Sequence, residues 1–178
     1  ILTPDICETT AAACSGPTTV ATLGSGTNLA AIGSPFIQNF GGFDYAARNQ
    51  YLIRASELQA LGYMNGGKID SISIELDVAG SAINGLQISM GCNGTLFTGL
   101  SVVRNAAAYT PTTGWNTFIL DNSYIWDGSS SLIIEFCTNT PQTGTTTQMR
   151  YQNTSFFSTN SVNIFSSGAC SQATGSQT

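Results

Sequence analysis

The chain has 178 residues, of which 42% are hydrophobic and 8% are charged, and its formal net charge is −5. A typical soluble domain has about 25% charged residues, so hydroxyl, amide and glycine residues must cover most of this surface. The hydrophobic fraction excludes disorder caused by low hydrophobicity, and the length suits one domain with a real core. The five basic residues are scattered, which excludes the basic stripe of a nucleic-acid or anionic-membrane binder.

The N-terminal part carries weak and irregular patterns. Residues 18–23 and 28–32 alternate weakly and predict two short strands. A glycine-rich stretch follows, in which aromatic residues are spaced at Phe36, Phe40, Phe43 and Tyr45. Because aromatic side chains usually bury, we expect core anchors in a loop that crosses the fold; an exposed aromatic platform is the alternative.

One short helix is predicted near residues 56–61. Ser56 is a suitable N-cap, Gln59 completes a capping box, and Gly62 can end the helix. A helix of this length needs tertiary packing to form.

Short strands separated by turn signals make up the rest of the chain. The clearest is 68–78, where Ile72, Ile74, Leu76 and Val78 alternate with polar residues, as in an antiparallel sheet with one buried face. Asn84-Gly85 is a hairpin-type turn signal. The other predicted strands are 48–54, 86–92, 96–104, 115–120, 131–137, 146–152 and 161–165.

This pattern predicts an all-β fold, an antiparallel β-sandwich or jelly roll of about 9–11 strands. We expect the sandwich to span residues 34–170, preceded by an extended segment, 1–33, and followed by a polar tail, 171–178.

Five cysteines and no CxxC pair predict one or two disulfides formed in an oxidising compartment. Cys92 and Cys137 are the first expected pair, because both lie at ends of predicted core strands. A local Cys7–Cys14 loop is the second, which leaves Cys170 as a buried free thiol or an intermolecular link.

Catalytic groups are scarce. Histidine is absent, which removes Ser-His-Asp catalysis and histidine metal sites. Glu135, inside an apolar strand, is either an outward-facing residue paired with an arginine or a buried carboxylate with a raised pKa. The sequence predicts no enzyme and no cofactor, while a structural calcium site built from distant backbone oxygens stays open.

The aromatic residues offer an alternative role in carbohydrate binding. Stacking on sugars is one interpretation of Trp115 and Trp126, but we expect both to pack as scaffold. The better surface candidates for stacking are Tyr63, Tyr109, Tyr124 and Tyr151.

Two segments resemble a known family of domains. Residues 114–120 read GWNTFIL and residues 125–137 read IWDGSSSLIIEFC; upstream, residues 50–60 read QYLIRASELQA. These motifs resemble the β-sandwich domains of large secreted and cell-surface proteins of Bacteroidota, the adhesin- and gliding-type proteins exported by type IX secretion. The resemblance covers roughly residues 48–170 and departs at Ser131, where asparagine is usual. Asp70-Ser71-Ile72 also resembles the O-glycosylation motif of that phylum, with Ser71 as acceptor.

The resemblance implies a secreted, non-enzymatic structural or adhesive domain at the cell surface. Its partners would be other copies in a filament, neighbouring domains of the same chain, or glycans, with no nucleic acid and no membrane insertion. Polymerisation would proceed by addition of the N-terminal segment as a strand to a neighbour's sheet. The alternative function is a carbohydrate-binding module.

Overall fold

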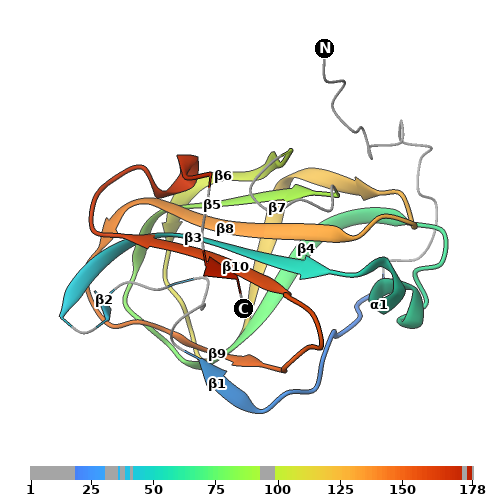
Figure 1. Ribbon diagram of the computed structural model, residues 1–178, viewed down its shortest axis with the longest axis horizontal. Helices are drawn as coiled ribbons and strands as arrows, with labels where there is room; N and C mark the ends of the chain where they lie inside the picture. Colours follow the sequence, from blue (N-terminus) through green and yellow to red (C-terminus); the bar gives the residue numbers. More distant parts are fainter. Residues whose placement is uncertain are drawn as a thin grey trace.

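The computed structural model describes residues 19–30, 36, 39–40, 42–92, 99–173 and 176–177, and these residues fold mostly into strands (Figure 1). The elements are β1 (Asn28–Ala30), β2 (Asn39–Phe40), β3 (Phe43–Ile53), α1 (Ala55–Ala60), β4 (Gly67–Val78), β5 (Ile83–Gly91), β6 (Ser101–Tyr109), β7 (Gly114–Trp126), β8 (Leu132–Gln142), β9 (Gln148–Tyr151), β10 (Thr159–Ile164), the 3-10 turn η1 (Ala169–Ser171) and β11 (Ser176–Gln177).

The strands form two antiparallel sheets, and the predicted all-β sandwich is confirmed. The small sheet has the order β1-β9-β4-β7; the large sheet has the order β11-β10-β3-β8-β5-β6, with β2 paired to β3. The chain crosses between the sheets repeatedly, for example from β3 to β4, from β4 to β5 and from β6 to β7. Such crossings place segments distant in sequence on one face.

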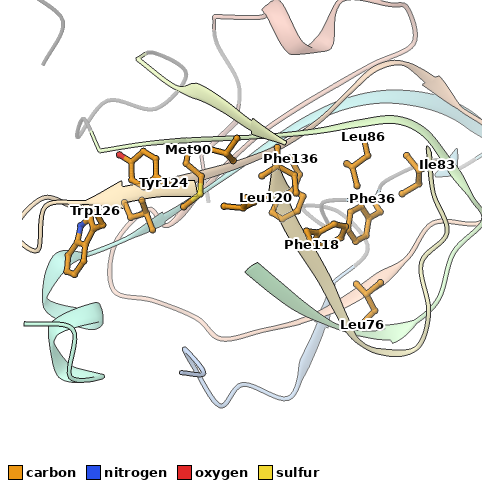
Figure 2. Packing of buried hydrophobic residues seen from close by; sticks show 13 residues of the cluster. Phe36, Leu76, Ile83, Leu86, Met90, Phe118, Leu120, Tyr124, Trp126 and Phe136 are labelled. Atoms are coloured by element: carbon orange, nitrogen blue, oxygen red, sulfur yellow. The ribbon is translucent and has the colours of Figure 1, made fainter. Parts of the chain in front are cut away.

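The core lies between the inner faces of the two sheets (Figure 2). Phe36 packs within it, with its ring centroid 5.8 Å from Phe118 and 5.9 Å from Phe136. The large sheet contributes Leu86 and Ile88 to the core, and Trp126 lies at one end of it. Phe36 is therefore a core anchor, as expected. Phe43 is not, because it lies exposed at the start of β3, and the side chain of Phe40 lies outside the described residues.

The alternation in β4 and β7 explains how these strands sit on the core. Leu76 is buried and Ile72 and Ile74 pack against the core, while Val78, expected on the same face, is exposed beyond a register shift. In β7, Phe118 and Leu120 point inward. The period of two therefore sets the buried face.

The short helix α1 is confirmed, with a different start from the one predicted. Its N-cap is Arg54, whose backbone N–H donates to the Glu57 carboxylate at 2.8 Å; Ser56 lies inside the helix. Gly62 ends it with φ +97, and the backbone N–H of Tyr63 donates to Leu58 O, which is a Schellman arrangement. Acidic Glu57 suits the first turn because it faces the positive end of the helix dipole.

Two local predictions are wrong. Asn84-Gly85 makes no hairpin turn; it lies inside β5 at a register shift, where Gly85 has φ +72. A glycine with positive φ serves a β-bulge as readily as a turn. Residues 19–23 form no strand, whereas Asn28–Ala30 do pair with β9, as predicted for 28–32.

Two glycines meet where the loop before β4 passes the turn after β7. A side chain added at Gly66 would lie 2.3 Å from the backbone oxygen of Trp126, and one added at Gly128 would lie 2.4 Å from the nitrogen of Gly66. Both glycines also have positive φ. Neither position has room for a β-carbon.

The sheets extend beyond the expected sandwich bounds of 34–170. β1 completes the edge of the small sheet, and β11 pairs with β10 within the expected tail.

Candidate functional site

The disulfide in the described part of the chain is not the expected one. Cys137 pairs with Cys170, with a Cα–Cα distance of 5.7 Å. The expected Cys92–Cys137 pair is therefore wrong, and so is the expectation that Cys170 is free or intermolecular. Cys92 is itself disulfide-bonded. The expected Cys7–Cys14 pair lies outside the described residues.

A buried polar group lies on the outer face of the large sheet, next to this disulfide. Glu135 Oε2 accepts hydrogen bonds from Arg48 Nε and Gln50 Nε2, each at 2.6 Å. Arg48 also donates to the backbone oxygen of Gln172, two residues beyond Cys170. Glu135 is 3% exposed and Arg48 is 7% exposed. The two alternatives for Glu135 each held part of the answer: the residue is buried, and it is paired with an arginine.

Three carboxylates of the described residues do not converge on one site. Glu135 lies on the outer face of the large sheet, whereas Glu75 and Asp77 belong to β4 of the small sheet. Among the described residues, no group of three or more cysteine or acidic side chains is arranged to hold a metal ion. No helix in that part of the chain has the length and apolar character to cross a membrane.

The four tyrosines expected on the surface lie in different environments. Tyr124 is 3% exposed in the core, and Tyr63 packs partly against the core. Tyr109 donates to Asn116 Oδ1 at 2.6 Å, and burial raises the pKa of its hydroxyl. Tyr151, on β9, is the most exposed of the four. The tyrosines do not form a common stacking surface.

Trp115 is exposed, so the scaffold role expected for it is wrong. Trp126 is buried and donates from Nε1 to Ser130 O at 2.7 Å, as a scaffold residue should. Trp115, expected to have the same role, is 54% exposed. It points outward because Asn116 takes the inward position and uses its side chain to bind the backbone oxygens of Thr112 and Gly114.

Trp115 belongs to a row of outward-facing side chains on β7 and β4. Trp115 lies opposite Glu75, Thr117 opposite Ser73, and Ile119 opposite Ser71; these six residues are called the Trp115 face below. Ile119 is 68% exposed. Ser71, the residue resembling an O-glycosylation acceptor, is exposed on this face.

The edge strand of the large sheet, β6, is a second exposed feature. Among the described strands it pairs with β5 alone, and residues 105–108 are exposed. The backbone N–H of Asn105 donates to the Asp121 carboxylate at 2.8 Å. The hydrogen bonds from Asn105 hold the pKa of Asp121 below its usual value. Arg104 turns toward the core, where its guanidinium lies 5.7 Å from the ring centre of Phe118. Ala106–Ala108 therefore form an edge without charged side chains.

The segment that precedes β1 is a third exposed feature. Residues 19–25 are exposed, and Val20 is 95% exposed. Thr19 Oγ1 lies within hydrogen-bond distance of the Tyr63 hydroxyl, at 3.4 Å. In Figure 1 this segment runs along the lower side of the molecule, while β6 lies along the upper edge.

Comparison with known proteins adds no relative: the chain matches no family model, no curated protein and no solved structure.

Proposed function

We propose that this protein is a non-enzymatic structural domain of the extracellular surface that assembles head to tail by β-strand addition. Residues 19–23 of one copy would pair along β6 of the next copy. The observation that carries the proposal is that one chain holds both a strand-prone segment outside its own sheets and an open sheet edge.

The donor segment has the sequence pattern of a strand, but it belongs to neither of the described sheets. Thr19, Val20 and Thr22 favour extended backbone, yet no described strand of the same chain pairs with them. Val20 gains most from a partner, because nearly all of its side chain is exposed to water.

Beyond Arg104, whose guanidinium turns toward the core, the acceptor edge lacks the devices that normally prevent strand addition. Natural edge strands carry lysine, proline or inward-pointing charges that discourage pairing. Residues 106–108 of β6 are three alanines, whose small side chains leave the backbone N–H and C=O groups accessible.

The positions of donor and acceptor favour an open polymer. The two surfaces differ and lie on opposite sides of the molecule in Figure 1, so the contact is heterologous and can repeat without closing. The Cys137–Cys170 disulfide supports an oxidising, extracellular compartment.

The test uses one variant of each surface. Val20→Pro removes a backbone donor from the segment, and Ala107→Lys places a charge on the edge. Each variant alone should be monomeric in light scattering and should form no filaments in negative-stain electron microscopy, whereas the parent chain polymerises. A 1:1 mixture should give discrete dimers, because each variant keeps one intact surface.

The matched control is Ala60→Lys, the same exchange at an exposed position in α1; it should polymerise like the parent chain. Filaments formed by Ala107→Lys, or a parent chain that stays monomeric at all concentrations, would overturn the proposal.

A further inference from the structure

The Trp115 face alternates apolar and polar side chains along β7, while its β4 side is polar throughout. Across the strands, Trp115 lies opposite Glu75 and Ile119 lies opposite Ser71. Between them, the hydroxyls of Ser73 and Thr117 are 2.8 Å apart and hydrogen-bonded to each other. No two large apolar side chains are direct neighbours in this arrangement.

This alternation does not suit a protein partner. The centre of a protein–protein interface is depleted of charged residues and concentrates apolar ones, whereas here a carboxylate stands beside the tryptophan. A sugar ring matches the pattern better, because it presents C–H groups on its faces and hydroxyls around its rim. An aromatic ring can cover such an apolar face, while carboxylate and hydroxyl oxygens bind the rim.

The charges next to the face favour a neutral ligand. Arg150 Nη2 lies 2.9 Å from Asp77 Oδ1, so the cation that interacts with Glu75 already has a partner. Asp77 forms the strongest interaction with Arg150, Glu75 attracts it as well, and together they raise the pKa of the guanidinium. Two carboxylates against one cation would repel an anionic polysaccharide.

The distance along β7 sets the minimum size of the ligand. Trp115 and Ile119 are four residues apart, which corresponds to about 14 Å along an antiparallel strand. A ligand that covers both must be a chain of several sugar residues.

We propose that the Trp115 face binds a neutral polysaccharide, with Trp115 stacked on one sugar ring, Glu75 accepting hydrogen bonds from its hydroxyls, and Ile119 contacting a ring further along the chain. This site is separate from the strand-addition surfaces, so it can be tested whether or not the protein polymerises.

The experiment measures binding of four neutral hexaoses, namely cellohexaose, xylohexaose, mannohexaose and laminarihexaose. Titration calorimetry is combined with iodide quenching of tryptophan fluorescence, because exposed Trp115 is accessible to iodide and buried Trp126 is not. At least one hexaose should bind and protect Trp115 from quenching. Trp115→Ala should weaken that binding about tenfold or more, and Glu75→Gln should weaken it less.

The matched control is Phe157→Ala, which removes an exposed aromatic ring outside the face and should leave affinity unchanged. Three results would overturn the proposal: no binding of any of the four hexaoses, equal affinity of Trp115→Ala, or tighter binding of hexagalacturonate than of every neutral hexaose. Loss of assembly in Trp115→Ala would also overturn it, because the face would then be a contact between copies.

Discussion

Removing the Cys137–Cys170 disulfide should lower the free energy of unfolding by about 3.7 kcal/mol. The two cysteines are 33 residues apart, and the loss of loop entropy in the unfolded chain gives this value at 25 °C for a loop of that length. The double variant Cys137→Ala/Cys170→Ala is preferred to serine, because Cys137 is buried and an unpaired hydroxyl there would add its own penalty. At about 2–4 °C per kcal/mol for a chain of this size, the thermal midpoint should fall by about 7–15 °C.

The assay is equilibrium unfolding in urea under non-oxidising, non-reducing conditions, followed by tryptophan fluorescence. Trypsin provides the control on connectivity, because cleavage after Lys68, Arg104 and Arg150 separates the peptides that carry Cys92, Cys137 and Cys170. Non-reducing mass spectrometry should find peptide 105–150 joined to peptide 151–178. A peptide 69–104 joined to 105–150, or a change in unfolding free energy under about 1 kcal/mol, would refute the reasoning.

Other substitutions test the core, the buried ion pair and one turn. Glu135→Gln leaves the buried Arg48 without its carboxylate and should cost about 3–5 kcal/mol in urea unfolding; a loss under about 1 kcal/mol would mean that water or another group compensates. Phe118→Ala should cost about 3–5 kcal/mol, while exposed Phe157→Ala should stay within about 0.5 kcal/mol; equal effects would contradict the packing. Burial acts to raise the pKa of Asp127, but hydrogen bonds from the two serines of its turn outweigh it and lower the pKa below its usual range. The ionised Asp127 carboxylate therefore stabilises the folded state fully above its unfolded pKa of about 3.9. This stabilisation is lost as the pH falls through the lower pKa that the carboxyl has in the folded state. The urea midpoint of Asp127→Asn should fall less between pH 6 and pH 2 than that of the parent chain, and parallel curves would contradict this assignment.

Local patterns predicted the architecture because each of them depends on neighbours in sequence. The alternation around Ile72 and Leu76 identified the buried face of β4, and Gly62 identified the end of α1 through its positive φ. The same local reasoning failed at Gly85, since a turn and a bulge need the same backbone conformation.

The candidate sites depended on contacts that no local pattern contains. Glu135 is buried because residues 169–172 cross the outer face of the large sheet, which also brings Cys170 to Cys137. Trp115 is exposed because Asn116 finds backbone partners in the preceding loop and takes the inward position. Hydrophobicity alone would predict that Glu135 is exposed and that Trp115 is buried.

The contact between Gly66 and Gly128 has a consequence for recognising distant relatives of this chain. Each glycine excludes a β-carbon because the backbone of the other loop occupies that space, so neither substitution can be rescued by shrinking its partner. Both positions should therefore stay glycine, although 61 residues separate them in the sequence. A search that requires a glycine just before the β4 strand together with the Trp-Asp-Gly corner would discriminate better than either motif alone, because it encodes a tertiary contact rather than a turn.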